Sequence, residues 1–202
     1  MAATRTRTDE LLEATCRVVA REGAHGLRMS DVAREAGVSS ALLHYYFETK
    51  SELLARAFAY AEARVRERSQ AELEGIEPAA ARLARLFELT VEDDPVFREN
   101  WVIWNEMWSS ALFDPDLRPS MAAAYEAWVG RIGDLLRDGR EDGSVPEEVD
   151  PADAAVRLAA VVDGMGSQVV LGVLGTEQAA EVVAGALALE LAPSRRTTRD
   201  RA

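Results

Sequence analysis

Two acidic residues in apolar surroundings are the strongest candidates for ligand chemistry in this chain of 202 residues. Glu106 follows Asn105 inside the tryptophan run WVIWNEMW, and Asp163 interrupts the apolar segment AAVVDGMG. A buried ionised carboxylate is costly unless a cation or hydrogen bonds compensate it. Tryptophan and tyrosine rings attract cations through their faces. The sequence therefore predicts an aromatic-lined pocket for an organic cation.

The predicted pocket lies between the two helices that carry these aromatic residues and the helix that carries Asp163. Asp163 is the better candidate for the anchoring charge, because its flanking residues are all apolar or Gly, whereas Glu106 has a polar neighbour and can face solvent. Two alternatives stay open. The tryptophans can fill a solid core, and Asp163 can bond internally to Arg131 or to an indole N–H. The candidate ligand-binding residues are Phe97, Trp101, Trp104, Asn105, Glu106, Trp108, Tyr125, Trp128 and Asp163.

Few residues are left for catalysis or for metal binding. Cys16 is the one cysteine, which excludes an internal disulfide and a cysteine-based metal site. The only histidines are His25 and His44, and no phosphate-cradling glycine loop accompanies them. We therefore expect no catalytic residue, no metal and no cofactor. The alternative is a helical enzyme that uses Glu106 and Asp163 as acid and base, although no nucleophile–histidine–carboxylate set supports it.

The charge of the chain is divided unevenly between its first fifty residues and the remainder. The formal net charge is −12, yet residues 1–50 hold equal numbers of basic and acidic groups. Only this neutral segment can approach a phosphate backbone without repulsion. No apolar run reaches the roughly 20 residues of a membrane span, and the N-terminus MAATRTRTDE lacks the apolar stretch of a signal peptide. We expect a cytoplasmic protein with no membrane partner.

The N-terminal segment carries the pattern of a helix-turn-helix. Residues 29–36 present an apolar face, Gly37 permits the positive φ of a tight turn, and Ser39 can cap the next short helix. The second helix of such a pair fits the major groove of DNA. Thr49 then opens a capping box, which predicts a further helix start beside Lys50, the one lysine of the chain.

The segment AREAGVSSALLHYYFETKSELL resembles the TetR family of bacterial transcriptional regulators, and the resemblance extends to about residue 55. It implies a homodimer with a three-helix DNA-binding head and a larger ligand-binding body. It implies that residues 39–42 face the bases or the groove wall, and that His44 and Lys50 contact phosphates. Phe47 matches a core residue of the family. Arg28 replaces the usual helix cap, and its guanidinium can reach a phosphate instead. The implied DNA-binding residues are Arg28, Ser39, Ser40, Ala41, Leu42, His44, Tyr45, Tyr46 and Lys50.

The run WVIWNEMWSSALFDPDLRPS is similar to the choline- and betaine-related branch of that family, whose effectors are quaternary ammonium compounds. Together the two resemblances imply a repressor that leaves a palindromic double-stranded DNA operator when a small molecule binds the body. Helix 50–74 joins the head to the body and is the expected lever. The alternative is a DNA-binding dimer without an effector, in which tryptophans fill the place of the pocket.

Helical signals dominate the chain, so the predicted fold class is all-α. Apolar residues recur at the 3.6-residue period of one helix face, and prolines stand where helices would begin. We expect a helix-turn-helix domain at 1–50, a six-helix ligand-binding and dimerisation domain at 51–192, and a disordered tail at 193–202. The predicted helices lie at about 8–22, 30–36, 40–46, 50–74, 79–92, 95–110, 116–138, 151–173 and 177–191.

The two C-terminal helices are apolar on more than one face. A helix of this kind must be covered on both sides, and small residues in helix 151–173 allow a close approach. We expect both helices to form a four-helix interface between two copies of the chain. Burial within one protomer is the alternative. The candidate interface residues are Val162, Val169, Val173, Val183 and Leu187.

Overall fold

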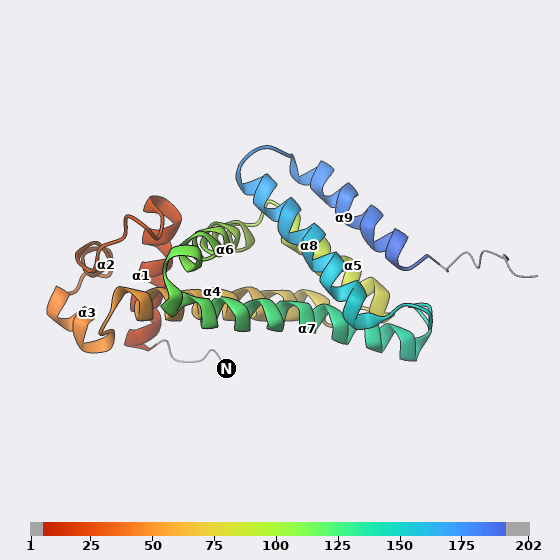
Figure 1. Ribbon diagram of the computed structural model, residues 1–202, viewed down its shortest axis with the longest axis horizontal. Coiled ribbons are helices and arrows are strands. Elements are labelled where there is room, and N and C mark those ends of the chain that lie inside the picture. The colour runs from red at the N-terminus through yellow and green to blue at the C-terminus, as the bar shows by residue number, and fades with distance from the viewer. Residues whose placement is uncertain (1–5, 193–202) are drawn as a thin grey trace, which may run out of the picture.

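The computed structural model describes residues 6–192, and every regular element among these residues is a helix, as the sequence predicted. A small head of three helices lies at one end of an elongated body (Figure 1). No helix in the described part of the chain is long and apolar enough to cross a lipid bilayer. The disordered tail expected at 193–202 lies outside the described residues. The elements are α1 (Arg7–Glu22), α2 (Met29–Glu35), α3 (Ser40–Tyr46), α4 (Lys50–Leu73), α5 (Ala79–Val91), α6 (Pro95–Phe113), the 3-10 turn η1 (Pro115–Leu117), α7 (Arg118–Asp142), α8 (Pro151–Val170) and α9 (Thr176–Glu190).

The head is a three-helix unit that packs around apolar side chains. Leu11, Val32 and Leu43 are fully buried, one from each helix. Gly37 adopts φ 66° in the turn between α2 and α3, a backbone conformation that favours glycine. The Ser39 hydroxyl accepts a hydrogen bond from the backbone N–H of Leu42 at 3.1 Å and caps α3, as predicted. The head therefore holds α3 on its surface with a defined start.

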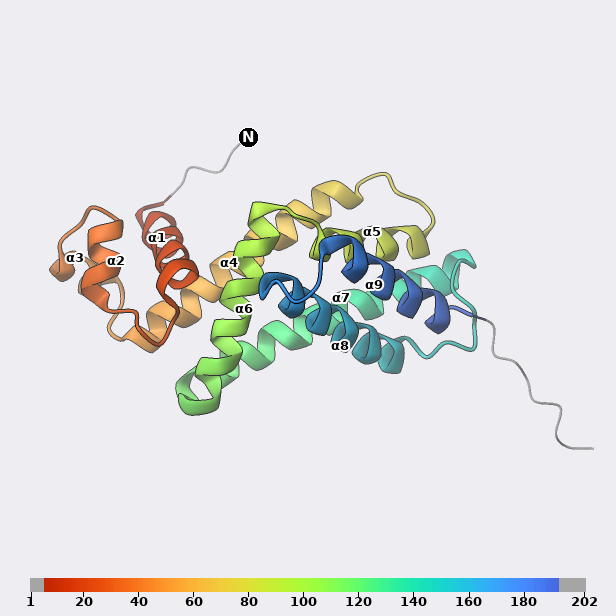
Figure 2. The ribbon, with the colours of Figure 1, turned by 90° about the horizontal axis from the view of Figure 1, so that it is seen from above.

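α4 connects the head to the body. Figure 1 shows it running from the head along most of the body, and Figure 2 shows α6 crossing it near the head. The Thr49 hydroxyl accepts a hydrogen bond from the Glu52 N–H at 3.0 Å and fixes the start of α4. Further along, Phe58 is buried, and its ring centroid lies 5.4 Å from that of Trp104 on α6. α4 thus contacts both the head and the aromatic residues of the body.

Aspartate residues cap three of the later helices. Asp94, Asp114 and Asp150 each precede a proline, and each carboxylate accepts hydrogen bonds from backbone N–H groups of the helix that follows. The Glu77-Pro78 pair differs, because Pro78 itself occupies the cap position of α5 and offers no side-chain acceptor. The end of α7 supplies the acceptors instead: the Asp142 carboxylate accepts from the Ala79 N–H at 2.7 Å, and the Ser144 hydroxyl accepts from the Ala80 N–H at 3.1 Å.

The C-terminal helices differ from the prediction in where they end and which faces they bury. α8 ends at Val170, because Gly172 turns with φ 70° and the Val173 N–H donates to the Gln168 carbonyl at 2.9 Å. Val173 is therefore a loop residue with an exposed side chain. The other candidate interface residues do not point outward from the protomer as expected. Val162, Val183 and Leu187 are buried within the protomer, and Val169 is half-buried. The large apolar residues of α8 and α9 that are exposed are Val156, Val182 and Leu189.

Candidate ligand cavity and DNA-binding surface

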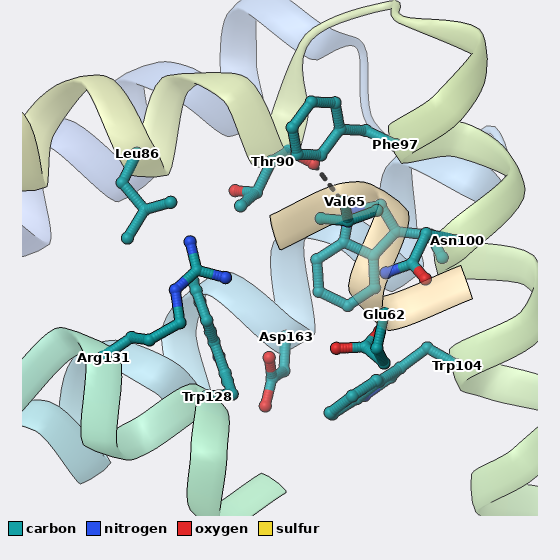
Figure 3. Close-up of a pocket in the computed structure, with 11 residues that line it drawn as sticks. Glu62, Val65, Leu86, Thr90, Phe97, Asn100, Trp104, Trp128, Arg131 and Asp163 are labelled. Atoms are coloured by element: carbon teal, nitrogen blue, oxygen red, sulfur yellow. Dashed lines mark hydrogen bonds between the residues drawn. The ribbon is translucent and has the colours of Figure 1, made fainter. Parts of the chain in front are cut away.

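A cavity of about 40 Å³ lies in the body where α4, α5, α6, α7 and α8 meet. In Figure 3 the carboxylates of Glu62 and Asp163 point into the space between the rings of Trp104 and Trp128. These two acidic and two aromatic side chains thus share one site, and they come from four different helices, α4, α6, α7 and α8. The lining residues are Glu62, Val65, Leu86, Thr90, Phe97, Asn100, Trp101, Trp104, Trp128, Arg131 and Asp163.

All the unpaired buried polar atoms of the described side chains gather at this cavity. Five buried side-chain atoms have no hydrogen-bond partner among residues 6–192, and all five belong to lining residues. Each such atom costs about 1–3 kcal/mol when it stays unsatisfied, so a native protein rarely concentrates them without a reason. These atoms are Glu62 Oε1, Asn100 Oδ1, Trp104 Nε1, Trp128 Nε1 and Asp163 Oδ1. The set offers both acceptors and donors to a guest molecule.

The electrostatics of the cavity favour a positively charged guest. Burial raises the pKa of Asp163 to about 7; the Trp128 indole opposes this shift, and the charge of Glu62 adds to it. Burial also raises the pKa of Glu62. A hydrogen bond from Asn100 and the charge of Arg131 partly offset this increase. The Arg131 guanidinium also lines the cavity, where it donates to the Ser69 hydroxyl at 2.9 Å and lies 5.7 Å from the Trp128 ring centroid. A cation in the cavity would stabilise both carboxylates in their ionised form.

Trp101 forms a wall that two contacts hold in place. Its indole N–H donates to the Thr90 carbonyl at 2.6 Å, the bond drawn in Figure 3. Its ring lies against α8 at Gly166, where an added Cβ would overlap the indole carbons. Asn105 supports the same wall, because its amide donates to the Trp101 carbonyl at 2.8 Å and accepts from the Ser167 hydroxyl at 3.0 Å. The glycine therefore sets how closely α6 and α8 approach.

This contact gives a stability prediction with a neighbouring control. Gly166→Ala should lower the free energy of unfolding by about 1–3 kcal/mol, because the methyl group must displace a hydrogen-bonded indole in a packed core. Gly164→Ala in the same helix meets no atom within 4 Å and should be neutral or stabilising. Urea unfolding followed by tryptophan fluorescence measures both. Equal stability of the two variants would contradict the assigned contact.

The structure brings together only part of the residues that the sequence suggested for the pocket. Phe97, Trp101, Trp104, Trp128 and Asp163 line the cavity, whereas Asn105, Glu106, Trp108 and Tyr125 do not.

Glu106 lies at the junction of head and body, where its carboxylate accepts a hydrogen bond from the Ala24 N–H at 2.7 Å. Trp108 is 43% exposed. Its ring centroid lies 6.4 Å from that of Trp104 and 6.0 Å from that of Tyr125. An aromatic series therefore runs from the cavity to the surface, and Glu106 faces away from Asp163.

Three lining residues with a charged or amide side chain were not expected from the sequence: Glu62, Asn100 and Arg131. A signal for Glu62 existed, because it lies four residues after Phe58 on the inner stripe of α4 and so places a charge on an apolar helix face. Asn100 directly precedes Trp101 and offered a weaker signal. Arg131 was considered only as an internal partner of Asp163, but its guanidinium donates a hydrogen bond to the Ser69 hydroxyl.

The residues expected to contact DNA lie on or beside α3. Ser39, Ser40, Ala41 and His44 are exposed, Tyr45 is 81% exposed, and Leu42 and Tyr46 are half-buried. Phe47 is fully buried, as its place in the family pattern implied. Arg28 is exposed at the cap position of α2, with no hydrogen bond from its side chain to that helix.

Lys50 connects the start of α4 to the loop between α1 and α2. Its ammonium donates to the His25 carbonyl at 2.9 Å, and burial lowers its pKa. The adjacent Ser51 hydroxyl donates to the Asp114 carboxylate at 2.7 Å. The first turn of α4 therefore touches both the head and the turn that follows α6.

Comparison with known families agrees with this architecture. Residues 11–57 match the family described as bacterial regulatory proteins of the tetR family. Residues 78–192, more than half of the chain, match the BetI-type transcriptional repressor C-terminal family. The chain therefore belongs to the TetR family, and it is a DNA-binding transcriptional regulator with a helix-turn-helix head. Within that family its body is of the BetI type.

Individual relatives extend the likeness over most of the chain. A TetR-family regulator from a Rhodococcus species is 34% identical, with a TM-score of 0.84, and the match covers 92% of this chain and 98% of that one. A transcriptional regulator from Saccharomonospora viridis, solved in complex with choline, is 32% identical with a TM-score of 0.78, over 88% and 93% of the two chains. The regulator BetI of Rhizobium meliloti is 27% identical over 79% of this chain and 75% of its own length.

Proposed function

We propose that the protein is a homodimeric repressor that acts in the cytoplasm and whose effector is an organic cation bound in the cavity. The observation that carries this proposal is the pair of carboxylates, Glu62 and Asp163, each with an unpartnered buried oxygen between Trp104 and Trp128. The unpartnered indole N–H groups also favour a cation that bears an oxygen acceptor. The choline complex of the Saccharomonospora viridis relative supports this chemistry.

Calorimetry with three compounds of matched shape tests the effector class. Choline, its neutral carbon isostere 3,3-dimethylbutan-1-ol, and the anion 3,3-dimethylbutanoate differ mainly in charge. We expect choline to bind with a Kd in about the micromolar range, since two or three aromatic faces and a carboxylate together can supply that affinity. The isostere should bind at least tenfold more weakly. Binding of the anion without binding of choline would refute the cation proposal.

Release from DNA requires that the effector prefer one arrangement of the two heads. A twofold dimer presents two copies of α3 to the two halves of a palindromic operator, so a change in head spacing weakens binding to both halves together. The effector can cause this change only if it binds the two arrangements with different affinity. α4 is the proposed lever, because Glu62 lines the cavity and Lys50 contacts the head within the same helix.

The proposed operator contact of Lys50 can be separated from base recognition. Lys50→Ala should weaken binding to all DNA sequences and reduce the slope of log K against log salt by about one unit, because one phosphate contact is lost. Ser40→Ala should instead change which sequences bind, since Ser40 is exposed on α3. Fluorescence anisotropy over a salt series, with an operator from genomic selection, measures both. An unchanged salt slope for Lys50→Ala would remove that residue from the interface.

The proposed dimer interface uses the exposed apolar residues of α8 and α9. Leu189→Glu should give a folded monomer, because the outward leucine is 80% exposed in the protomer and its carboxylate would be buried unpaired between two copies. Leu112→Glu, at another exposed leucine, is the matched control and should remain dimeric. Sedimentation and circular dichroism measure assembly and folding. If both Leu189→Glu and Val182→Glu remain dimeric, the interface lies on another surface of the protomer.

Other functions receive less support. An enzyme that uses Glu106 and Asp163 as acid and base is disfavoured, because Glu106 is bonded to the Ala24 N–H at the head–body junction. We therefore propose that the protein is not an enzyme. A regulator without an effector would need a solid core, whereas unpartnered polar atoms surround a cavity here.

A further inference from the structure

A second and larger cavity adjoins the first. It measures about 530 Å³ and lies between α4 and α7, where small side chains keep the two helices from filling the space. Six of its twelve lining residues are alanines. We call this space the alanine groove; its lining is Ala55, Phe58, Ala59, Glu62, Ala63, Arg66, Ser120, Ala123, Ala124, Ala127, Trp128 and Arg131.

Three residues separate the alanine groove from the inner cavity. Glu62, Trp128 and Arg131 line both spaces and form a shared wall. Two of them carry a buried atom without a hydrogen bond of normal geometry, Glu62 Oε1 and Trp128 Nε1, although Asn100 and Trp128 still act on the carboxylates of Glu62 and Asp163. At the inner end Trp104 is only 4% exposed, and its indole N–H also has no partner. Polar atoms that a ligand could bind therefore lie both in the wall, at Glu62 and Trp128, and in the inner cavity, at Trp104.

The volumes of the two spaces decide how a ligand can be accommodated. The inner cavity of about 40 Å³ holds about three water molecules, so a substituted ammonium ion such as choline enters it only when side chains at the shared wall move. The alanine groove is more than ten times larger, and beyond the wall six alanines and Phe58 line it together with Arg66 and Ser120. Side-chain movement at the wall would join the two spaces into one site with a charged, aromatic end and an apolar end.

We propose that this joined site binds an amphiphilic organic cation. The charged head lies against Asp163 and Glu62, and an apolar extension runs between α4 and α7 past Ala59 and Ala124. This inference rests on the proposed cation effector and makes it more specific: the preferred ligand carries a longer apolar chain than choline does. The wall that the groove shares with the cavity supports this occupant, because Glu62, Trp128 and Arg131 border both spaces.

A homologous series of alkyltrimethylammonium ions, from methyl to hexyl, tests the inference by calorimetry on the full-length protein. Affinity should increase by up to about fourfold with each added methylene, since each leaves water for an apolar surface. Ala59→Leu and Ala124→Leu fill the groove and should abolish this increase with chain length. Ala71→Leu, at an exposed alanine of α4 outside the groove, should behave like the unaltered chain.

The possible outcomes separate this inference from the proposed function. Binding of tetramethylammonium without any increase along the series would overturn the joined site and leave the cation effector intact. Failure of every cation to bind would overturn both. A change of oligomeric state in Ala59→Leu, measured by sedimentation, would show that the groove receives a second copy of the chain and would also overturn the inference.

Discussion

Asp163→Asn should reduce the affinity for choline at pH 8 by at least tenfold. The substitution keeps the size of the side chain and removes the negative charge that lies between Trp104 and Trp128 in the cavity. A charge partner in a partly desolvated site commonly contributes more than 1.4 kcal/mol, which is a factor of ten in the dissociation constant. Glu67→Gln, at an exposed carboxylate of α4, is the control and should bind choline normally. Calorimetry decides, and equal affinity of both variants would exclude Asp163 as the anchor.

The same substitution should change how choline affinity depends on pH. Burial raises the pKa of Asp163 to about 7, so the carboxyl group is neutral below that pH and ionised above it. A cation binds the ionised form better, and affinity should therefore fall as the pH decreases from 8 to 6. In Asp163→Asn this part of the pH dependence should disappear. A titration of the unaltered protein that is flat over this range would contradict the assignment.

Stability should respond in the opposite direction to binding. Because the pKa of Asp163 rises from 3.8 to about 7 on folding, the folded chain binds more protons than the unfolded chain between these values. Its contribution to stability is therefore present at low pH and is lost as the pH rises through 7. Asp163→Asn should melt at a higher temperature than the unaltered protein at pH 8, and the difference should shrink toward pH 4. Scanning calorimetry without ligand measures this.

Glu106→Ala should uncouple choline binding from DNA binding. α6 carries Trp101 and Trp104 at the cavity, and Glu106 on the same helix accepts the Ala24 N–H of the head. Loss of this hydrogen bond should leave choline affinity unchanged, since Glu106 does not line the cavity. The factor by which choline weakens operator binding, typically 5–150 in coupled systems, should fall toward one.

Two further variants control this experiment. Glu106→Gln keeps an oxygen acceptor for the Ala24 N–H and should retain much of the coupling. Ser109→Ala, at an exposed position of α6, should retain all of it. Anisotropy titrations of the operator with and without saturating choline give the coupling factor for each variant. A loss of choline affinity in Glu106→Ala would instead indicate that Glu106 belongs to the ligand site.

Local signals predicted the fold well because helix ends depend on short stretches of sequence. The Asp-Pro pairs at 94, 114 and 150 cap helices as expected, and Gly37 turns between the two helices of the motif. The start of α5 depends on Asp142 and Ser144, some sixty residues away, which no local pattern reveals.

The candidate site was only partly predictable, because the phase of a helix decides which neighbours share a face. Glu106 lies two residues after Trp104, which corresponds to about 200° around the helix, and so it points away from the cavity that Trp104 lines. The same limit applies to the C-terminal helices. Val183 faces the core of the protomer, while its neighbour Val182 is exposed. Apolar composition alone does not distinguish these two faces.

The contact between Lys50 and the His25 carbonyl makes the junction of head and body chemically addressable. Lys50 carries the only side-chain amine of the 202 residues, and burial lowers its pKa, which increases the fraction of nucleophilic free amine. An amine-directed reagent therefore has one side-chain target, and that target is the proposed phosphate contact itself. Protection of this one amine by bound DNA would thus report occupancy of the operator without an engineered cysteine.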